Sequence, residues 1–349
     1  RSLKIKNLKI KKGKIPIFVA EISGNHNQKF STALKLIKTA KNSGADAVKF
    51  QFYDEDDMTL NSKNEEFLIK DKKSPWSGKY LFDLYKKSST PKTWFKKMFQ
   101  YSNKIGLPCF TSVFNHKSVD FLEKIGNPAY KISSFEINHI PLIERVAKTG
   151  KPIIMSTGVA NNIEISEAIK ICKKYKNNKI VLLKCSSEYP AKLNESNLNS
   201  IPYFKKKYKC FVGLSDHTKG ITASISAYHK GACMIEKHLK LEEKRKVVDE
   251  DFSLTPNEFY LMTNICKNLK SAEGKHKFKI SKSVKLNSQF KRSIYTSKKV
   301  IKGSLVNSKN IIIIRSNKGL HPKYYTKIIN KKFSKNLNIA TPLKKSFVI

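Results

Sequence analysis

Eight short apolar runs, alternating with stretches of helical periodicity, limit the folds open to this chain of 349 residues. The runs cover residues 17–23, 47–53, 108–114, 129–135, 152–157, 180–187, 211–216 and 234–239. The later helical patterns lie near residues 91–105, 116–125, 140–149, 161–176, 195–208, 219–231 and 255–270. Strands and helices that alternate in this way indicate a parallel sheet, and eight such units predict an α/β fold of the (β/α)8 TIM-barrel type.

The first helix has the clearest pattern. Ser31 is expected to cap it, and Gly44 is expected to end it. The apolar residues between them recur at positions 33, 36, 37 and 40, which fall on one face of a helix.

Two segments fall outside the strand–helix repeat. Residues 54–90 are long for a loop between a strand and a helix, so we expect them to cover a substrate. After the barrel domain, residues 1–275, comes a lysine- and serine-rich linker at 276–289. Residues 290–349 show short strands with glycine turns, which predicts a small β-rich domain. A chain of about 60 residues rarely packs well alone, so this domain should dock on a barrel.

Polar side chains interrupt the apolar runs or follow them directly. Every strand of such a barrel points its C-terminal end at one face, so these side chains should converge on a single mouth. They are Glu21, Asn25, His26, Lys49, Gln51, Thr111, Lys131, Ser134, Ser156, Lys184, Ser186, Ser215, Asp216, His217, Glu236, Lys237 and His238.

The composition of this set favours particular ligands. A single lysine in a strand is commonly a snorkelling residue, but three, at 49, 131 and 184, beside several hydroxyls favour a site for phosphate and carboxylate. His217 and His238 end neighbouring strands and can reach one cation, and Glu21 lies near them. This donor set predicts a divalent metal, with Mn²⁺ or a similar ion preferred over a closed cysteine zinc site. For His26, a structural and a functional role both remain open.

The net charge of +42 suggests a polyanion partner when it is considered alone. Only five of the 69 basic residues are arginine, however, and the lysines are spread over the whole chain. We therefore expect no nucleic-acid partner. The six cysteines form no CxxC pair, which fits a reducing cytoplasm. The longest aliphatic run, 311–314, is far too short to span a membrane, so no membrane partner is expected.

Seven stretches, taken in order, resemble the sialic acid synthase family of bacterial nonulosonic acid synthases. They are AEISGNHN, GADAVKFQ, YKISSFE, PIIMSTG, LLKCSSEYP, GLSDHT and IEKH. The sequences SGNHNQ at 23–28 and WSGKYLFDLY at 76–85 are similar to those of the pseudaminic acid branch of this family. The C-terminal part resembles the antifreeze-like (SAF) domain of the family, which implies a domain-swapped homodimer.

The resemblance assigns a role to each matching residue. It implies that His217 and His238 hold the metal, Mn²⁺ first and Mg²⁺ or Co²⁺ as alternatives, and that Glu21 assists proton transfer. It also implies that Asp249 and Arg315 contact the sugar. The residues that would hold phosphoenolpyruvate are Lys49, Thr111, Lys131, Ser134, Ser156, Lys184, Ser186 and Ser215.

The activity that the resemblance implies is a metal-dependent condensation of phosphoenolpyruvate with an N-acylated amino sugar, which releases phosphate. For the pseudaminic acid branch the sugar is 2,4-diacetamido-2,4,6-trideoxy-L-altrose. The alternatives are synthesis of N-acetylneuraminate or legionaminic acid, a polyanion-binding protein with an inactive barrel, and an aldolase with a Schiff-base lysine.

Overall fold

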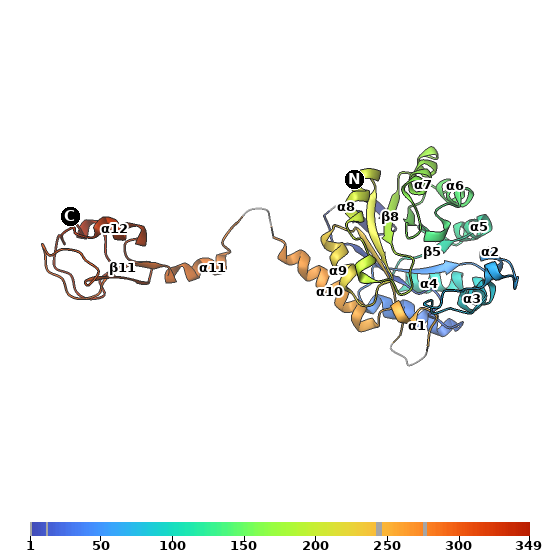
Figure 1. Ribbon diagram of the computed structural model, residues 1–349, viewed down its shortest axis with the longest axis horizontal. Coiled ribbons are helices and arrows are strands. Elements are labelled where there is room, and N and C mark those ends of the chain that lie inside the picture. Colours follow the sequence, from blue (N-terminus) through green and yellow to red (C-terminus); the bar gives the residue numbers. More distant parts are fainter. Residues whose placement is uncertain (1, 12, 242–245, 275–277) are drawn as a thin grey trace. The chain divides into compact units, whose positions relative to one another are not determined.

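The computed structural model describes residues 2–11, 13–241, 246–274 and 278–349. The chain divides into two compact units, Arg1–Gly274 and Lys275–Ile349 (Figure 1). The expected linker begins in residues 275–277, which lie outside the described residues. In the described part of the chain, no helix has both the length and the apolar character needed to cross a bilayer.

Eight parallel strands close into a barrel in the first unit, which confirms the predicted TIM-barrel architecture. The strands are β3 (Ile17–Glu21), β4 (Ala47–Phe52), β5 (Cys109–Val113), β6 (Tyr130–Ile132), β7 (Ile153–Ser156), β8 (Ile180–Cys185), β9 (Phe211–Asp216) and β10 (Met234–His238). They pair in chain order, and β10 closes the ring on β3 with His238 beside Glu21. Each strand is as long as its apolar run or shorter, because the terminal residues of most runs belong to the loops.

The helices that follow the strands surround the barrel (Figure 1). They are α1 (Phe30–Asn42), α4 (Phe95–Lys104), α5 (His116–Lys124), α6 (Ile140–Ala147), α7 (Asn162–Lys174), α8 (Ser200–Tyr208), α9 (Thr222–His229) and α10 (Pro256–Ala272). Short turns η3 (Ser134–Glu136), η4 (Leu193–Glu195) and η5 (Glu250–Phe252) follow β6, β8 and β10.

Helix α1 buries the four apolar positions that its pattern predicted, at 33, 36, 37 and 40. The prediction that Ser31 caps this helix is wrong. Lys29 occupies the N-cap position, and its carbonyl already accepts a hydrogen bond from the amide of Ala33 at 3.0 Å. Gly44 lies just beyond the end of the helix with φ of +83°, and a Cβ there would come within 2.8 Å of Thr263 Oγ1, so the position requires glycine.

Alternation along the strands separates two apolar cores. One set of strand residues, including Phe18, Val48 and Ile235, packs outward against the helices. The other set, including Val19, Phe110 and Leu183, packs inside the barrel. Inward positions near the C-terminal strand ends are instead polar, so the same parity that builds the inner core also selects which side chains enter the mouth.

A hairpin of β1 (Ser2–Ile5) and β2 (Leu8–Lys11) precedes the barrel, and the sequence did not predict it. Its apolar residues Leu3, Ile5 and Ile10 are buried in the inner core. The hairpin therefore closes the N-terminal end of the barrel, opposite the strand ends that carry the polar residues.

The 54–90 segment contains α2 (Glu55–Met58), η1 (Glu65–Phe67) and α3 (Leu81–Ser88), and η2 (Lys92–Trp94) follows it. The second unit contains α11 (Lys282–Leu286), η6 (Asn287–Phe290), η7 (Pro322–Tyr324), α12 (Tyr325–Ile328) and η8 (Lys345–Phe347). It also contains the antiparallel pair β11 (Arg292–Thr296) and β12 (Ile311–Arg315). Its own small core includes Ile294, Val306 and Phe333, and its identity as an SAF domain stays a prediction.

Candidate active site

A cavity of about 770 Å³ lies at the C-terminal ends of the barrel strands. Eight of the thirteen predicted site residues line it, so the expected convergence on one mouth is largely present. The eight are Lys49, Lys131, Ser134, Ser156, Ser215, His217, His238 and Asp249. Glu21 joins them indirectly, because its carboxylate pairs with the ammonium of Lys49.

Alternating charges form the floor of this cavity. Lys49 Nζ lies between Glu21 and Glu236, at 3.7 Å from Glu236 Oε1. The same oxygen is 3.4 Å from Lys131 Nζ and accepts a hydrogen bond from Ser215 Oγ at 3.0 Å. Glu236 thus links two lysines on strands β4 and β6, and the sequence alone gave it no role beyond its place in the mouth.

Burial and pairing affect the two lysines differently. Burial opposes the charge on Lys49, but Glu21 and Glu236 outweigh it and raise the pKa of this ammonium above its ordinary value. Burial lowers the pKa of Lys131, and Glu236 offsets this only in part. An added anion would supply Lys131 with the negative charge that its surroundings lack, so Lys131 is the better candidate to contact an anionic substrate.

Strand parity corrects the prediction for Thr111. Its neighbours Cys109 and Val113 pack outward against the helices, so Thr111 points away from the mouth as they do. Ser112 points inward instead and accepts a hydrogen bond from Lys49 Nζ at 3.1 Å. Once the structure places Phe110 inside the barrel, the two-residue period of the strand selects Ser112 as the next inward residue.

The same parity corrects the predictions for Lys184 and Ser186. Leu183 packs inside the barrel, so Lys184 lies on its outer side, where Nζ donates to the Cys185 carbonyl at 2.6 Å. Neither Lys184 nor Ser186 is among the described residues that line the cavity, whereas Cys185 and Ser187 are. The anion site therefore has two mouth lysines rather than three.

Small polar groups make a cradle between strands β6 and β7. Ser134 Oγ accepts a hydrogen bond from the amide of Gly158 at 3.0 Å. A Cβ at Gly158 would come within 2.0 Å of Ser187 Oγ, so only glycine lets these groups approach one another. Ser156 Oγ is buried and has no hydrogen-bond partner among the described residues, which leaves it free to bind a ligand.

The two predicted metal ligands lie next to one another, with ring centroids 5.4 Å apart. His217 Nδ1 is 3.0 Å from the carbonyl oxygen of Ser186, a contact that makes Nδ1 the donor and leaves Nε2 as a free ligand atom. His238 Nδ1 is 3.2 Å from Asp249 Oδ2, and both atoms are buried without a hydrogen bond to any described residue. This buried pair of a ring nitrogen and a carboxylate oxygen fits the coordination of a cation.

The described residues contain no group of three or more histidines, cysteines or carboxylates arranged to hold a metal. A cation held by His217 and His238 would therefore need oxygen atoms of water or substrate to complete its coordination. Such an open donor set suits an exchangeable, catalytic ion rather than a structural one.

Aromatic side chains surround the two histidines. The ring of Tyr189 lies 4.5 Å from that of His217, and the ring of Phe252 lies 4.8 Å from that of His238. The ring of Trp76, from the 54–90 segment, packs against that of Tyr189 with centroids 5.5 Å apart. Trp76 Nε1 donates a hydrogen bond to the Val248 carbonyl at 3.3 Å. This segment therefore forms one wall of the cavity, as its length suggested.

The turn after β3 has a structural role. His26 is fully buried and interacts through both ring nitrogens, with Thr90 Oγ1 at 2.9 Å and the amide of Gln28 at 3.1 Å. Burial lowers its pKa to about 4, so it is neutral at physiological pH. Asn25 Oδ1 accepts a hydrogen bond from the amide of Asp249 at 3.2 Å and so fixes the loop that carries this predicted sugar ligand.

Glu136, which the sequence reasoning did not select, also lines the cavity. Its Oε2 is buried and has no hydrogen-bond partner in the described part of the chain, and burial raises its pKa from 4.5 to about 7. Between pH 4.5 and 7 the unfolded chain loses this proton while the folded protein keeps it. Stability should therefore fall as pH rises through this window and level off above it.

Replacing Glu136 with glutamine should remove that dependence. We expect the wild-type free energy of unfolding to fall by about 3 kcal/mol more than that of Glu136→Gln between pH 4.5 and 7.5. Denaturant titrations across this range measure the difference. Glu167, which is exposed on α7, supplies the control variant Glu167→Gln, which should follow the wild type. Parallel curves for wild type and Glu136→Gln would contradict the raised pKa.

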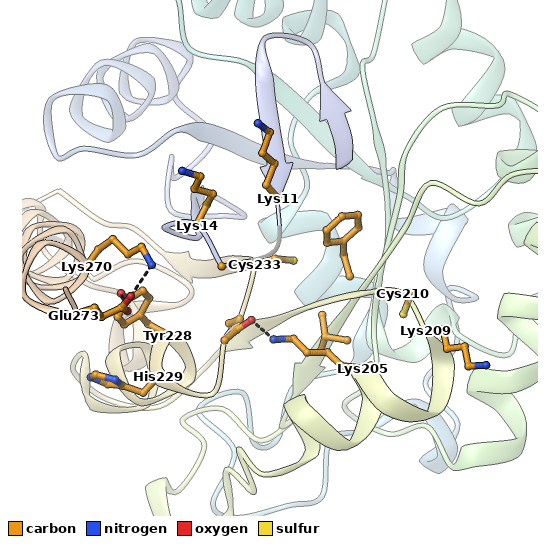
Figure 2. A pocket seen from close by; sticks show the side chains of 15 residues that line it. Lys11, Lys14, Lys205, Lys209, Cys210, Tyr228, His229, Cys233, Lys270 and Glu273 are labelled. Carbon is orange, nitrogen blue, oxygen red and sulfur yellow. Dashed lines mark hydrogen bonds and ion pairs between the residues drawn. The ribbon is translucent and has the colours of Figure 1, made fainter. Parts of the chain in front are cut away.

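A second cavity of about 510 Å³ lies at the N-terminal ends of β9 and β10 (Figure 2). Its described lining includes none of the thirteen predicted site residues. The carboxylate of Glu273 there is already bound by Lys270 and by the hydroxyl of Tyr228. Arg315 belongs to the second unit, so its contact with a sugar stays a prediction.

Comparisons with known proteins agree with this geometry. The family model described as the NeuB family matches residues 36–278. The chain is 40% identical over 326 residues to the pseudaminic acid synthase of Campylobacter jejuni subsp. jejuni, covering 93% of this chain and 94% of that protein. It is 40% identical over 329 residues to the pseudaminic acid synthase of Helicobacter pylori, covering 94% and 96%.

The fold has a close counterpart among solved structures. The N-acetylneuraminic acid synthetase of Leptospira borgpetersenii, in complex with citrate, superposes with a TM-score of 0.72 at 29% identity. The match covers 82% of this chain and 95% of that one.

Proposed function

The chain belongs to the NeuB family, and from this premise we propose that it acts as a pseudaminic acid synthase. One observation carries the proposal: a two-lysine anion site and a histidine pair share one cavity, as a condensation between an anionic and a neutral substrate requires. The cavity volume of about 770 Å³ is in the usual range for small-molecule sites.

Phosphoenolpyruvate would occupy the anion site. Lys131 would bind its negative charge, and the hydroxyls of Ser134 and Ser156 would donate to phosphate and carboxylate oxygens. Ser215 would join them by turning its hydroxyl from Glu236 to the anion. Ser112 would replace Thr111 as the β5 hydroxyl that supports this site, because it lies on the inner side of the barrel and accepts a hydrogen bond from the mouth lysine Lys49.

Condensation would join C3 of phosphoenolpyruvate to the aldehyde carbon of the open-chain sugar. Water adds at C2, and the C–O bond to phosphate then breaks, which releases phosphate and the keto acid. Glu21, paired with Lys49, would guide the proton that leaves the attacking water. Lys131 and Lys49 would stabilise the charge that develops near C2 and on the phosphate.

His217 and His238 would hold a divalent cation, Mn²⁺ or else Mg²⁺ or Co²⁺, and Asp249 lies beside the pair. A bound cation would supply Lewis-acid polarisation of the aldehyde oxygen. Chelation by EDTA should therefore abolish phosphate release, and Mn²⁺ should restore it. Undiminished activity after exhaustive dialysis against EDTA would contradict the metal requirement.

The sugar would lie against the wall formed by the 54–90 segment. This wall combines the apolar side chains of Met58, Ile69, Trp76, Leu81 and Leu84 with the polar side chains of Asp71, Lys73, Ser74 and Ser88. A 6-deoxy sugar with two acetamido groups offers three methyl groups to the apolar part of this surface. These contacts support the diacetamido-trideoxy sugar over N-acetylmannosamine, which offers a single methyl group.

The proposal includes a homodimer in which the C-terminal unit covers a mouth and presents Arg315 to the sugar. Residues 275–349 contain 18 lysines and two arginines but no aspartate or glutamate. A unit this basic would attract an anionic substrate towards a mouth that it covers. All six cysteines are free thiols, which supports a cytoplasmic location.

Phosphate release from phosphoenolpyruvate with Mn²⁺ tests the proposal, with two sugars offered in parallel. We expect release with 2,4-diacetamido-2,4,6-trideoxy-L-altrose and about 100-fold less with N-acetylmannosamine, which lacks two of the methyl groups that the apolar side chains of the wall would contact. Release with N-acetylmannosamine alone would place the chain in the neuraminate branch. If a folded sample releases no phosphate with either sugar, the polyanion-binding alternative would be favoured.

A further inference from the structure

We propose that Asp216 and Lys237, a buried ion pair outside the barrel mouth, are positioning residues that hold His217 in the orientation required of a metal ligand. The inference rests on the metal role in the proposed function. It concerns two residues that do not line the cavity and to which nothing above gives a task.

The pair lies on the outer side of β9 and β10, between the strands and helix α9. Lys237 is opposite Asp216 in the strand register, and Lys237 Nζ is 3.2 Å from Asp216 Oδ2. Both side chains are almost completely excluded from solvent, with 0% and 2% exposure. Asp216 Oδ2 also accepts a hydrogen bond from Ser224 Oγ on α9, at 2.6 Å.

The pair binds all the polar groups of Thr218, the residue after His217. Asp216 Oδ1 accepts hydrogen bonds from the amide of Thr218 at 2.9 Å and from its hydroxyl at 2.8 Å. Lys237 Nζ donates to the carbonyl of Thr218. His217 therefore lies between Asp216 and a neighbour that this pair fixes, and we call these contacts the Thr218 clamp.

The clamp leaves the His217 backbone little freedom. The carbonyl of His217 also accepts a hydrogen bond from the amide of Ala191 at 2.9 Å. Hydrogen bonds hold the backbone on both sides of His217, so the ring can keep Nδ1 at 3.0 Å from the Ser186 carbonyl and present Nε2 to the cavity. Loosening the clamp should let the ring move, because the contacts with the Ser186 carbonyl, with Cys185 Sγ at 3.7 Å and with the Tyr189 ring would then orient it on a backbone that is less firmly held.

A buried ion pair is weak support for stability, because apolar residues of similar volume commonly replace it at no loss. Removing one partner leaves an unpaired buried charge, which removing both partners avoids. In both cases the buried polar groups of Thr218 and the hydroxyl of Ser224 lose hydrogen-bond partners, so some stability is lost together with the clamp. The double substitution avoids the larger cost of a lone buried charge, and a denaturant titration of each variant checks that metal binding is measured on folded protein.

The test compares full-length wild type with the double variant Asp216→Leu/Lys237→Met. Its control is Glu123→Leu/Lys151→Met, which removes an ion pair of 2.7 Å far from the mouth. Calorimetric titration with Mn²⁺ should show 10- to 100-fold weaker binding in the first double variant, as loss of a second-shell contact typically does. Affinity for phosphoenolpyruvate without metal should stay within about twofold, because the anion site is untouched.

The imidazole of His217 gives a readout that needs no metal. In histidine-labelled protein, the hydrogen on Nδ1 should exchange slowly in wild type and in the control, and faster than detection in the clamp variant. Unchanged Mn²⁺ affinity together with an unchanged Nδ1–H signal would overturn the proposal. If the leucine variant fails to fold, Asp216→Asn/Lys237→Met preserves the volume and serves in its place.

Wild type that binds no more Mn²⁺ than His217→Ala would remove the metal role, which is a failure of the proposed function. The clamp would then be judged on the Nδ1–H signal alone. The two failures are therefore distinguishable in one set of samples.

Discussion

Replacing Lys131 with methionine is expected to lower kcat/KM for phosphoenolpyruvate by about 10³-fold, or about 4 kcal/mol of transition-state stabilisation. Lys131 is the mouth cation with the least compensation, since burial lowers its pKa and Glu236 offsets this only in part. A bound trianion would supply the missing partner. Steady-state phosphate release at saturating sugar measures the loss.

Lys131→Met should fold, because Glu236 keeps Lys49 and Ser215 as partners. Lys184→Met is the matched control: it removes a half-buried lysine from a barrel strand, but one on the outer side, and we expect less than a threefold change. A large loss of kcat/KM in Lys184→Met and none in Lys131→Met would show that Lys184, and not Lys131, faces the anion site.

Replacing Glu21 with glutamine is expected to lower kcat by about 10²- to 10³-fold, the usual contribution of a general acid or base. The amide keeps the acceptor that binds the amide of Ser23 at 2.9 Å. It loses the charge that pairs with Lys49 and the capacity to move a proton. Because the anion site remains, KM for phosphoenolpyruvate should change less than kcat.

Asp46→Asn gives a matched control for this variant. Asp46 is a half-buried carboxyl beside β3, where Oδ2 accepts a hydrogen bond from the amide of Phe18 at 2.9 Å, and it lies toward the opposite end of the strand. Its substitution should leave kcat unchanged. Near-normal turnover of Glu21→Gln with Mn²⁺ present would show that Glu21 has no role in proton transfer.

The order of apolar runs was sufficient to predict the barrel. Periods of two and 3.6 residues are local properties of a sequence, and eight alternating units leave few ways to bury their apolar faces. The same reasoning placed Glu21, Lys131, His217 and His238 at one mouth. A parallel barrel directs all strand ends to one face whatever the details of packing.

The N-terminal hairpin escaped prediction because its residues alternate lysine with leucine or isoleucine, which the basic composition concealed. Leu3, Ile5 and Ile10 became recognisable as core only when the open end of the barrel provided a surface for them. The N-cap of helix α1 was also missed. The helix begins where the turn at residues 26–29 ends, and the apolar pattern of the helix does not show where that turn lies.

By itself the sequence determined which strands exist and that polar groups gather where they end. Only the tertiary structure decided which side of each strand faces the mouth, so Ser112 replaces Thr111 and Lys184 falls outside. It also decided that Glu236 links Lys49 to Lys131, and that Asp216 and Lys237 meet behind His217. The physical reason is that pairing between strands depends on register and barrel closure, which bring together residues such as 49 and 236 that no local pattern connects.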